Sequence, residues 1–156
     1  MPGGAVLVQV ALDTETGTTR IEHLVWVDNA GTELNPMLAR GQMWGGQMMG
    51  LGEALFERVV FDEYGQLLTG SFMDYAKPNT DDLPDAVALS GVARPSLATN
   101  TPLGAKGIGE ARCIGVQAAM VNAVLDAACP DGNEPVDIAL PLTTERIWRM
   151  MQRTGR

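Results

Sequence analysis

The residues best able to do chemistry form a glycine-rich run, Gly104-Ala105-Lys106-Gly107-Ile108-Gly109, that ends in Glu110. Because glycine has no Cβ, its backbone N–H can approach a ligand closely. The start of a helix adds partial positive charge at the same place. The pattern therefore predicts a site that holds an oxyanion or a polar ligand edge, with Glu110 projecting beside it.

Glu110 has two interpretations that the residues alone leave open. A carboxylate beside glycine backbone, in a pocket that excludes water, can act as a general base. It can also be an ordinary acid in the first turn of a helix, where the helix dipole stabilises it by about 0.3–1 kcal/mol. Lys106 is likewise either a donor to a phosphate or carbonyl, or a surface lysine.

Two well-known phosphate motifs are excluded for this loop. It is not a Walker A loop, because no Gly-Lys-Ser/Thr follows at the required spacing. It is not a dinucleotide fingerprint, because no strand directly precedes the glycines.

A second cluster, Gly41-Gln42-Met43-Trp44-Gly45-Gly46, lies in a predicted helix over residues 36–58. The planar amide of Gln42 offers both a donor and an acceptor, which suits the edge of a heterocycle. Each glycine inside a helix costs about 1 kcal/mol relative to alanine. Five glycines between positions 41 and 52 therefore predict that a ligand or another backbone lies close to this helix. Taken singly, Gln42 reads as a surface residue and Trp44 as a core residue.

The elements that must position these residues predict an α+β fold of short antiparallel hairpins packed with two or three helices, in one domain spanning 1–156. Asn35 and Pro36 are typical of a helix start. The final helix should carry Ile147, Trp148 and Met151 on one apolar face. In chain order we expect strands 5–12 and 21–27 as a hairpin, helix 36–58, a short hairpin of 59–61 with 67–72, a strand at 86–92, a long loop over 93–109, helix 111–128, an extended piece at 136–140 and a helix from about 143.

Composition excludes several classes of function. The chain has 156 residues, 46% of them hydrophobic, and a net charge of −8, so we expect a globular domain that does not bind nucleic acid. Polar residues interrupt the apolar segment 111–128, which argues against a membrane span. Cys113, Cys129 and one histidine form no metal-ligand cluster, so we expect no metal ligand from this chain. No export signal opens the sequence, which favours a cytoplasmic location.

Several motifs together resemble the C-terminal part of the molybdopterin-binding large subunit of molybdenum hydroxylases, the group of xanthine dehydrogenase, aldehyde oxidase and aerobic carbon monoxide dehydrogenase. The resemblance runs from about Val6 to Met151. It is carried by residues 41–46, Gly70-Ser71-Phe72-Met73-Asp74-Tyr75, residues 102–110, Val121-Asn122-Ala123-Val124 and Pro141-Leu142-Thr143.

The resemblance implies a specific activity and site. Glu110 would be the base that deprotonates a molybdenum-bound water or hydroxide, in the water-derived hydroxylation of an aldehyde, N-heterocycle or similar electron-poor carbon. The cofactor is molybdopterin, with the mononucleotide and cytosine dinucleotide forms both open. Its contacts would come from Gln42, Gly45, Gly46, Ala105, Lys106, Gly107, Ile108 and Gly109.

The resemblance also implies partners. Iron–sulfur clusters and FAD are expected only on partner chains, so the partners would be the remaining large-subunit portion, an iron–sulfur subunit and an FAD subunit, besides a small-molecule substrate. This chain alone should be inactive. Two departures stand out: Trp44 where many members have histidine or glutamate, and Arg112, which could pair with Glu110 or shape the substrate entrance. The alternatives are a non-catalytic pterin- or nucleotide-binding module and a structural fragment that requires partner chains.

Overall fold

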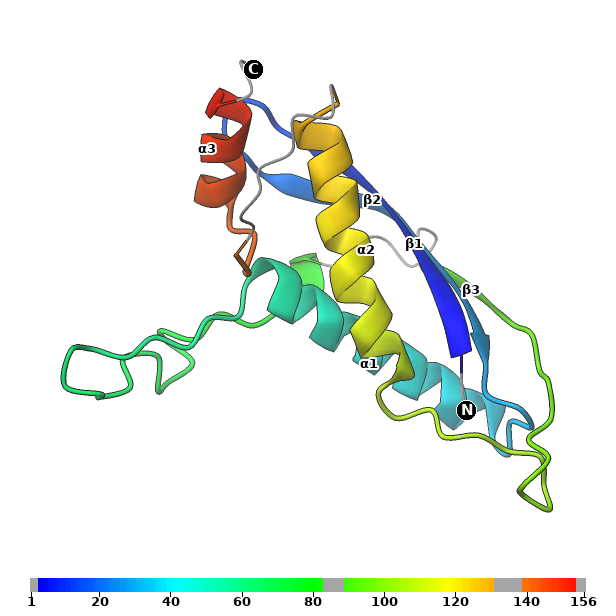
Figure 1. Cartoon of the computed structure of the whole chain (residues 1–156). Helices are drawn as coiled ribbons and strands as arrows, with labels where there is room; N and C mark the ends of the chain where they lie inside the picture. Colours follow the sequence, from blue (N-terminus) through cyan, green and yellow to red (C-terminus); the bar gives the residue numbers. More distant parts are fainter. Residues whose placement is uncertain (1–2, 83–88, 131–138, 154–156) are drawn as a thin grey trace.

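The computed structural model describes residues 3–82, 89–130 and 139–153, and shows a mixed three-stranded sheet packed with helices (Figure 1). The sheet order is β1-β2-β3, with β1 antiparallel to β2 and β3 parallel to β2. The predicted α+β class is confirmed. The elements are β1 (Gly3–Leu12), β2 (Thr19–Asn29), α1 (Pro36–Leu55), a short 3-10 helix (Thr80–Asp82), β3 (Leu89–Ala93), α2 (Ala111–Ala128) and α3 (Thr144–Arg153).

The hairpin of β1 and β2 is confirmed and carries much of the core. Successive strand side chains alternate between the two faces, and Leu24, Trp26 and Asp28 of β2 all point to the buried face. At the turn, the Gly17 N–H donates to the carbonyl of Asp13 over 2.8 Å, and Gly17 takes a φ of +79°. The opposite face of the sheet stays open, with exposed apolar side chains in all three strands.

Helix α2 lies against both β1 and α1, and glycines make the contact between the two helices close. A Cβ on Gly46 would lie 3.5 Å from the Cβ of Arg112, and one on Gly50 only 2.7 Å from the carbonyl oxygen of Cys113. The backbone of α2 therefore lies beside these two glycines. This agrees with the prediction that glycines are placed inside a helix, despite their cost in stability, where another group comes close. Around this contact the core includes Met43, Leu51, Val116 and Met120.

Gly50→Ala tests this close contact. The added methyl must displace the α2 backbone, so we expect a loss of about 1–3 kcal/mol in the free energy of unfolding. Gly41→Ala in the same helix is the matched control, because a Cβ there has nothing within 4 Å. Removing a helix glycine without a clash should leave stability unchanged or raise it by up to about 1 kcal/mol. Equal shifts of both variants in thermal unfolding would show that the α1–α2 distance does not depend on Gly50.

Several predicted elements differ from the structure. The second hairpin is confirmed only in its first residues: Phe61 pairs with Leu67 in an antiparallel bridge, and the N–H groups of Leu68 and Asp62 donate to the carbonyls of Val60 and Gln66, but no longer strand forms over residues 59–72. The segment extends away from the body, so no neighbouring strand is there to build a sheet on it (Figure 1). Helix α1 ends at Leu55 rather than near 58. On the expected apolar face of α3, Ile147 and Met151 are buried, whereas Trp148 is 39% exposed.

The predicted strand over 86–92 is confirmed from Leu89 onward, as β3. Its first residues, and positions 136–138 of the expected extended piece, lie outside the described residues. The N-cap at Asn35 is confirmed, since its side chain accepts from the N–H groups of Met37 and Leu38. The predicted helix over 111–128 is confirmed at both ends.

The extended segment after α1 exposes a group of large apolar side chains. Its base is held by a 2.7 Å hydrogen bond from the Tyr75 hydroxyl to the carboxylate of Glu57, which raises the pKa of Tyr75. Exposed side chains of this number favour contact with further protein surface. They are Val59, Phe61, Tyr64, Leu68, Phe72 and Met73. No helix in the described ranges combines the length and apolar character needed to cross a bilayer.

Candidate functional site

A cavity of about 470 Å³ lies between the start of α1 and the glycine-rich loop. It brings Gln42 together with Ala105, Lys106, Ile108 and Gly109, which are far apart in sequence and were predicted to share one site. The rest of its wall comes from the β2–α1 connection and the first turns of α1: Ala30, Thr32, Glu33, Leu34, Asn35, Leu38 and Ala39.

The connection after β2 holds the start of the glycine-rich loop. Gly31 and Gly104 both have positive φ, at 66° and 67°, and the Gly104 carbonyl lies directly against Gly31, where a side chain would not fit. The Lys106 N–H donates to the Ala30 carbonyl over 2.8 Å, and Gly31 pairs with Ala105 in an isolated bridge. The loop is therefore tied by its backbone to the end of β2.

Lys106 contributes to the cavity wall while its ammonium group is anchored elsewhere. Its Nζ donates to the hydroxyl of Ser96 over 3.0 Å. Ser96 is itself fixed by Asn29, whose amide donates to the same hydroxyl over 2.7 Å and whose Oδ1 accepts from the Ser96 N–H. The ammonium group is therefore bonded to a residue that does not line the cavity.

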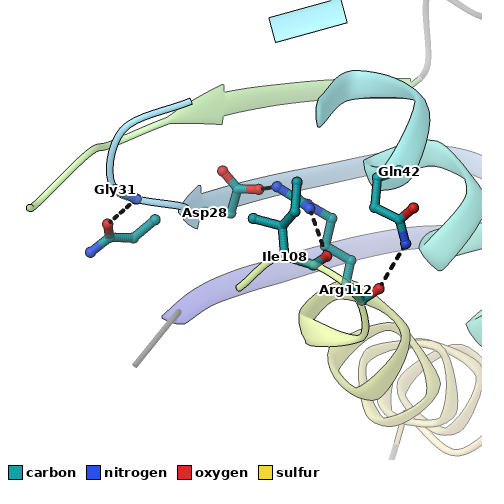
Figure 2. Close-up of polar contacts among 7 residues, drawn as sticks. Asp28, Gly31, Gln42, Ile108 and Arg112 are labelled. Atoms are coloured by element: carbon teal, nitrogen blue, oxygen red, sulfur yellow. Dashed lines mark hydrogen bonds and ion pairs between the residues drawn. The ribbon is translucent and has the colours of Figure 1, made fainter. Parts of the chain in front are cut away.

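The far end of the loop is held by side chains. The Gln42 amide donates to the Gly109 carbonyl over 3.0 Å, and Arg112 Nη1 donates to the Ile108 carbonyl over 3.4 Å (Figure 2). Arg112 also forms an ion pair with Asp28, and the two side chains are only 4% and 8% exposed. Burial lowers the pKa of the Arg112 guanidinium, whose ordinary value is high enough to keep it charged.

Sequence reasoning missed Asp28 and misplaced the partner of Arg112. Arg112 pairs with Asp28 and not with Glu110, and it is not part of the cavity wall. One signal was available. Asp28 follows Leu24 and Trp26 at alternate positions of a strand, so a charge on that face must have a buried partner.

The backbone donors before α2 are unused within the described part of the chain. There, the N–H groups of Gly107, Ile108, Gly109 and Glu110 donate to no protein acceptor. A Cβ on Gly107 or Gly109 would have nothing within 4 Å, so no other group packs where a side chain would project from these two glycines. Such a run of open amides can bind an anion or a polar ligand edge.

Glu110 is the N-cap residue of α2, directly after Gly109 of the cavity wall, and its side chain is exposed. Its backbone is already in the αR region, and its side chain makes no capping hydrogen bond. Helix capping therefore does not explain this carboxylate. Within the described ranges it also forms no ion pair.

Three residues predicted to bind the cofactor are not among those that line this cavity: Gly45, Gly46 and Gly107. Gly46 faces Arg112 and Cys113 at the α1–α2 contact, and Gly45 lies on the exposed side of α1. Cys113 is buried, and burial together with the carboxylate of Glu53 raises the pKa of its thiol. This thiol is therefore a poor nucleophile at neutral pH.

A larger cavity of about 850 Å³ lies at the other end of α1, between Leu55, the start of β2 and the start of α3. It contains none of the predicted site residues. Of these two cavities the smaller is the better candidate, because Ile108 and Gly109 of the open amide run and the start of α1 all line it. The fold and this cavity define a ligand-binding α+β module whose main donors are backbone amides.

Comparison with known proteins identifies the family. The chain belongs to the molybdopterin cofactor-binding domain family, whose model matches residues 1–84. It is similar to the nicotine 6-hydroxylase large subunit of Paenarthrobacter nicotinovorans, at 39% identity over 94% of this chain and 17% of the relative. It is also similar to the 6-hydroxypseudooxynicotine dehydrogenase complex subunit gamma of that organism, at 38% identity over 97% of this chain and 18% of the relative.

The fold likeness agrees with the sequence likeness. A crystal structure of a copper- and molybdenum-containing carbon monoxide dehydrogenase superposes with a TM-score of 0.89, at 29% identity, over 99% of this chain and 19% of that one. The resemblance to molybdenum hydroxylase large subunits is thereby confirmed. The chain spans about a fifth of the length of the relatives it matches.

Proposed function

We propose that the cavity between α1 and the glycine-rich loop binds molybdopterin, and that Glu110 is the general base of the hydroxylase containing this chain. The chain is a molybdopterin-binding region of the molybdenum hydroxylase type. The observation that carries the proposal is the run of unused amides from Gly107 to Glu110 beside the cavity that Gln42 lines.

The residues present fit the chemistry of this cofactor. A pterin has an edge of alternating donors and acceptors, which amide groups such as that of Gln42 and open backbone N–H groups match. A phosphate group suits the amide run and the nearby Lys106 ammonium. The contacts we propose come from Gln42 and residues 105–109, whereas Gly46 supports the site through helix packing.

The mechanism divides the work between cofactor and chain. When bound, molybdopterin supplies the redox-active metal that takes up the substrate's electrons. This chain's part is to hold the pterin through its amides and to place a carboxylate at the end of the amide run. One oxygen of Glu110 accepts a proton from the water that becomes the new hydroxyl. Burial of Arg112 against Asp28 leaves that carboxylate without a competing cation from α2.

We further propose that the substrate carbon belongs to an N-heterocycle or an aldehyde. The first is favoured because two relatives are named for nicotine and a hydroxylated nicotine derivative. Residues 1–156 form one module of the site, inactive without the remaining large-subunit portion. An iron–sulfur subunit and an FAD subunit would carry the electrons onward. The pterin bound by this site is either the mononucleotide or the cytosine dinucleotide form.

Metal and pterin analysis of the purified, assembled complex tests this function. We expect stoichiometric molybdenum and a fluorescent pterin after oxidation, together with substrate-dependent reduction of an electron acceptor. Bound cofactor without turnover in the presence of all partners would favour the alternative of a non-catalytic pterin-binding module. Absence of both molybdenum and pterin would contradict the proposal.

The exposed apolar segment predicts how the chain behaves alone. Side chains such as Phe61, Phe72 and Met73 seldom stay solvated in such number. We therefore expect the isolated chain to self-associate in size-exclusion chromatography, and co-expression with the remaining large-subunit portion to suppress this. A monodisperse monomer with a cooperative unfolding transition would show that the segment needs no partner surface.

A further inference from the structure

Side chains from outside the glycine-rich loop hold two neighbouring carbonyls of that loop. Arg112 donates to the Ile108 carbonyl over 3.4 Å, and Gln42 donates to the Gly109 carbonyl over 3.0 Å (Figure 2). A trans peptide is planar, and its C=O and N–H point in opposite directions. The direction of each carbonyl therefore fixes the direction of the next N–H. These two contacts orient the amide donors of Gly109 and Glu110.

The two holding side chains differ in how firmly they are placed. Gln42 is exposed, and within the described ranges its side chain is held by its hydrogen bond to Gly109. Arg112 is buried and paired with Asp28. Asp28 belongs to a strand with a partner on each side, since it is opposite Gly4 of β1 and Ala93 of β3. The ion pair between Asp28 and Arg112 therefore fixes the position of the glycine-rich loop relative to β2, the central strand.

We propose that Asp28 and Arg112 are positioning residues that set the peptide between Ile108 and Gly109. Neither side chain is part of the cavity wall, so we assign both a role that acts through the loop backbone. Through that peptide they direct the amide donors at the cavity and the backbone from which Glu110 projects. The inference rests on the proposed function, because it states what these donors and this acid are held for.

The test uses the assembled holoenzyme and two variants. Arg112→Lys keeps a cation beside Asp28, but an ammonium lacks the planar fork that serves a carboxylate and a carbonyl together. The double variant Asp28→Leu/Arg112→Met removes both charges, which buried sites often tolerate without loss of stability. Displacing a group that supports a cofactor site typically lowers affinity or activity about 10–100-fold.

We expect kcat to fall about tenfold in Arg112→Lys and about 10–100-fold in the double variant, with KM within about threefold of the unchanged enzyme. Molybdenum and pterin content per assembled subunit should fall in the double variant while its melting temperature is retained. Glu145→Gln/Arg149→Met, which removes an exposed ion pair in α3, is the control and should change none of these readings.

The results separate this inference from the proposed function. Wild-type kcat and cofactor content in both variants would overturn the positioning role while leaving molybdopterin binding intact. A kcat loss that merely follows the unfolded or unassembled fraction would overturn it as well. If the unaltered complex carries no molybdopterin, the proposed function fails, and the positioning role fails with it.

Discussion

Glu110→Gln in the assembled enzyme is expected to lower kcat by about 10²–10⁴-fold, the range that a general base contributes. Glutamine keeps the size and polarity of the side chain but cannot accept a proton at neutral pH. Glu110 makes no capping bond and, within the described residues, no ion pair, so its loss should not disturb the fold. Molybdenum content should therefore stay at the wild-type level.

Stopped-flow reduction by substrate, with metal analysis of the same sample, measures this effect at the chemical step. Glu145→Gln is a matched control, because Glu145 is likewise an exposed glutamate at the start of a helix. It should leave kcat unchanged. Turnover of Glu110→Gln at near the wild-type rate would reject the base assignment, whereas loss of molybdenum would assign Glu110 to cofactor retention.

Local signals in the sequence predicted the elements that build the site. The alternation of β1 and β2, the cap at Asn35 and the apolar period of residues 111–128 each act within a few neighbouring residues, so one sequence suffices to read them. The second hairpin formed only as a single bridge for the opposite reason. Strand propensity in residues 59–72 needs a neighbouring sheet to extend the pairing, and among the described residues this segment pairs with no strand of the sheet.

The residues of the candidate site could be predicted from the sequence, but the contacts that hold them in place could not. The helix glycines showed that something must approach α1 closely, and the structure shows that at Gly50 this is the backbone of α2. The sequence could not distinguish a backbone from a ligand, because either one excludes a side chain. The partner of Arg112 was equally hidden. Asp28 is 84 positions away (112 − 28 = 84), and only the packing of β2 against the start of α2 brings the two together.

Asp28→Ala is the change with the largest expected effect on stability. It leaves the Arg112 guanidinium buried without its counter-ion, and removing one partner of a buried ion pair typically costs about 3–5 kcal/mol. The melting temperature should fall accordingly, by fewer degrees per kcal/mol the larger the unit that unfolds cooperatively. Differential scanning fluorimetry of the assembled subunit measures it directly.

The loss of stability in Asp28→Ala should arise because the Arg112 charge stays buried without a counter-ion, and not because a contact is lost. Asp28→Leu/Arg112→Met removes the charge as well as the pair, so its melting temperature should lie within a few degrees of the unaltered subunit. Glu145→Ala breaks an ion pair whose partners are about two-thirds exposed, at 68% and 66%, and should cost less than about 1 kcal/mol. If Asp28→Ala melts no lower than Glu145→Ala, water reaches Arg112 and the pair is not a buried support of the loop. The double variant could instead melt as low as Asp28→Ala. In that case the attraction between Asp28 and Arg112 itself stabilises the fold. The relative position of the sheet and the glycine-rich loop then depends on that attraction.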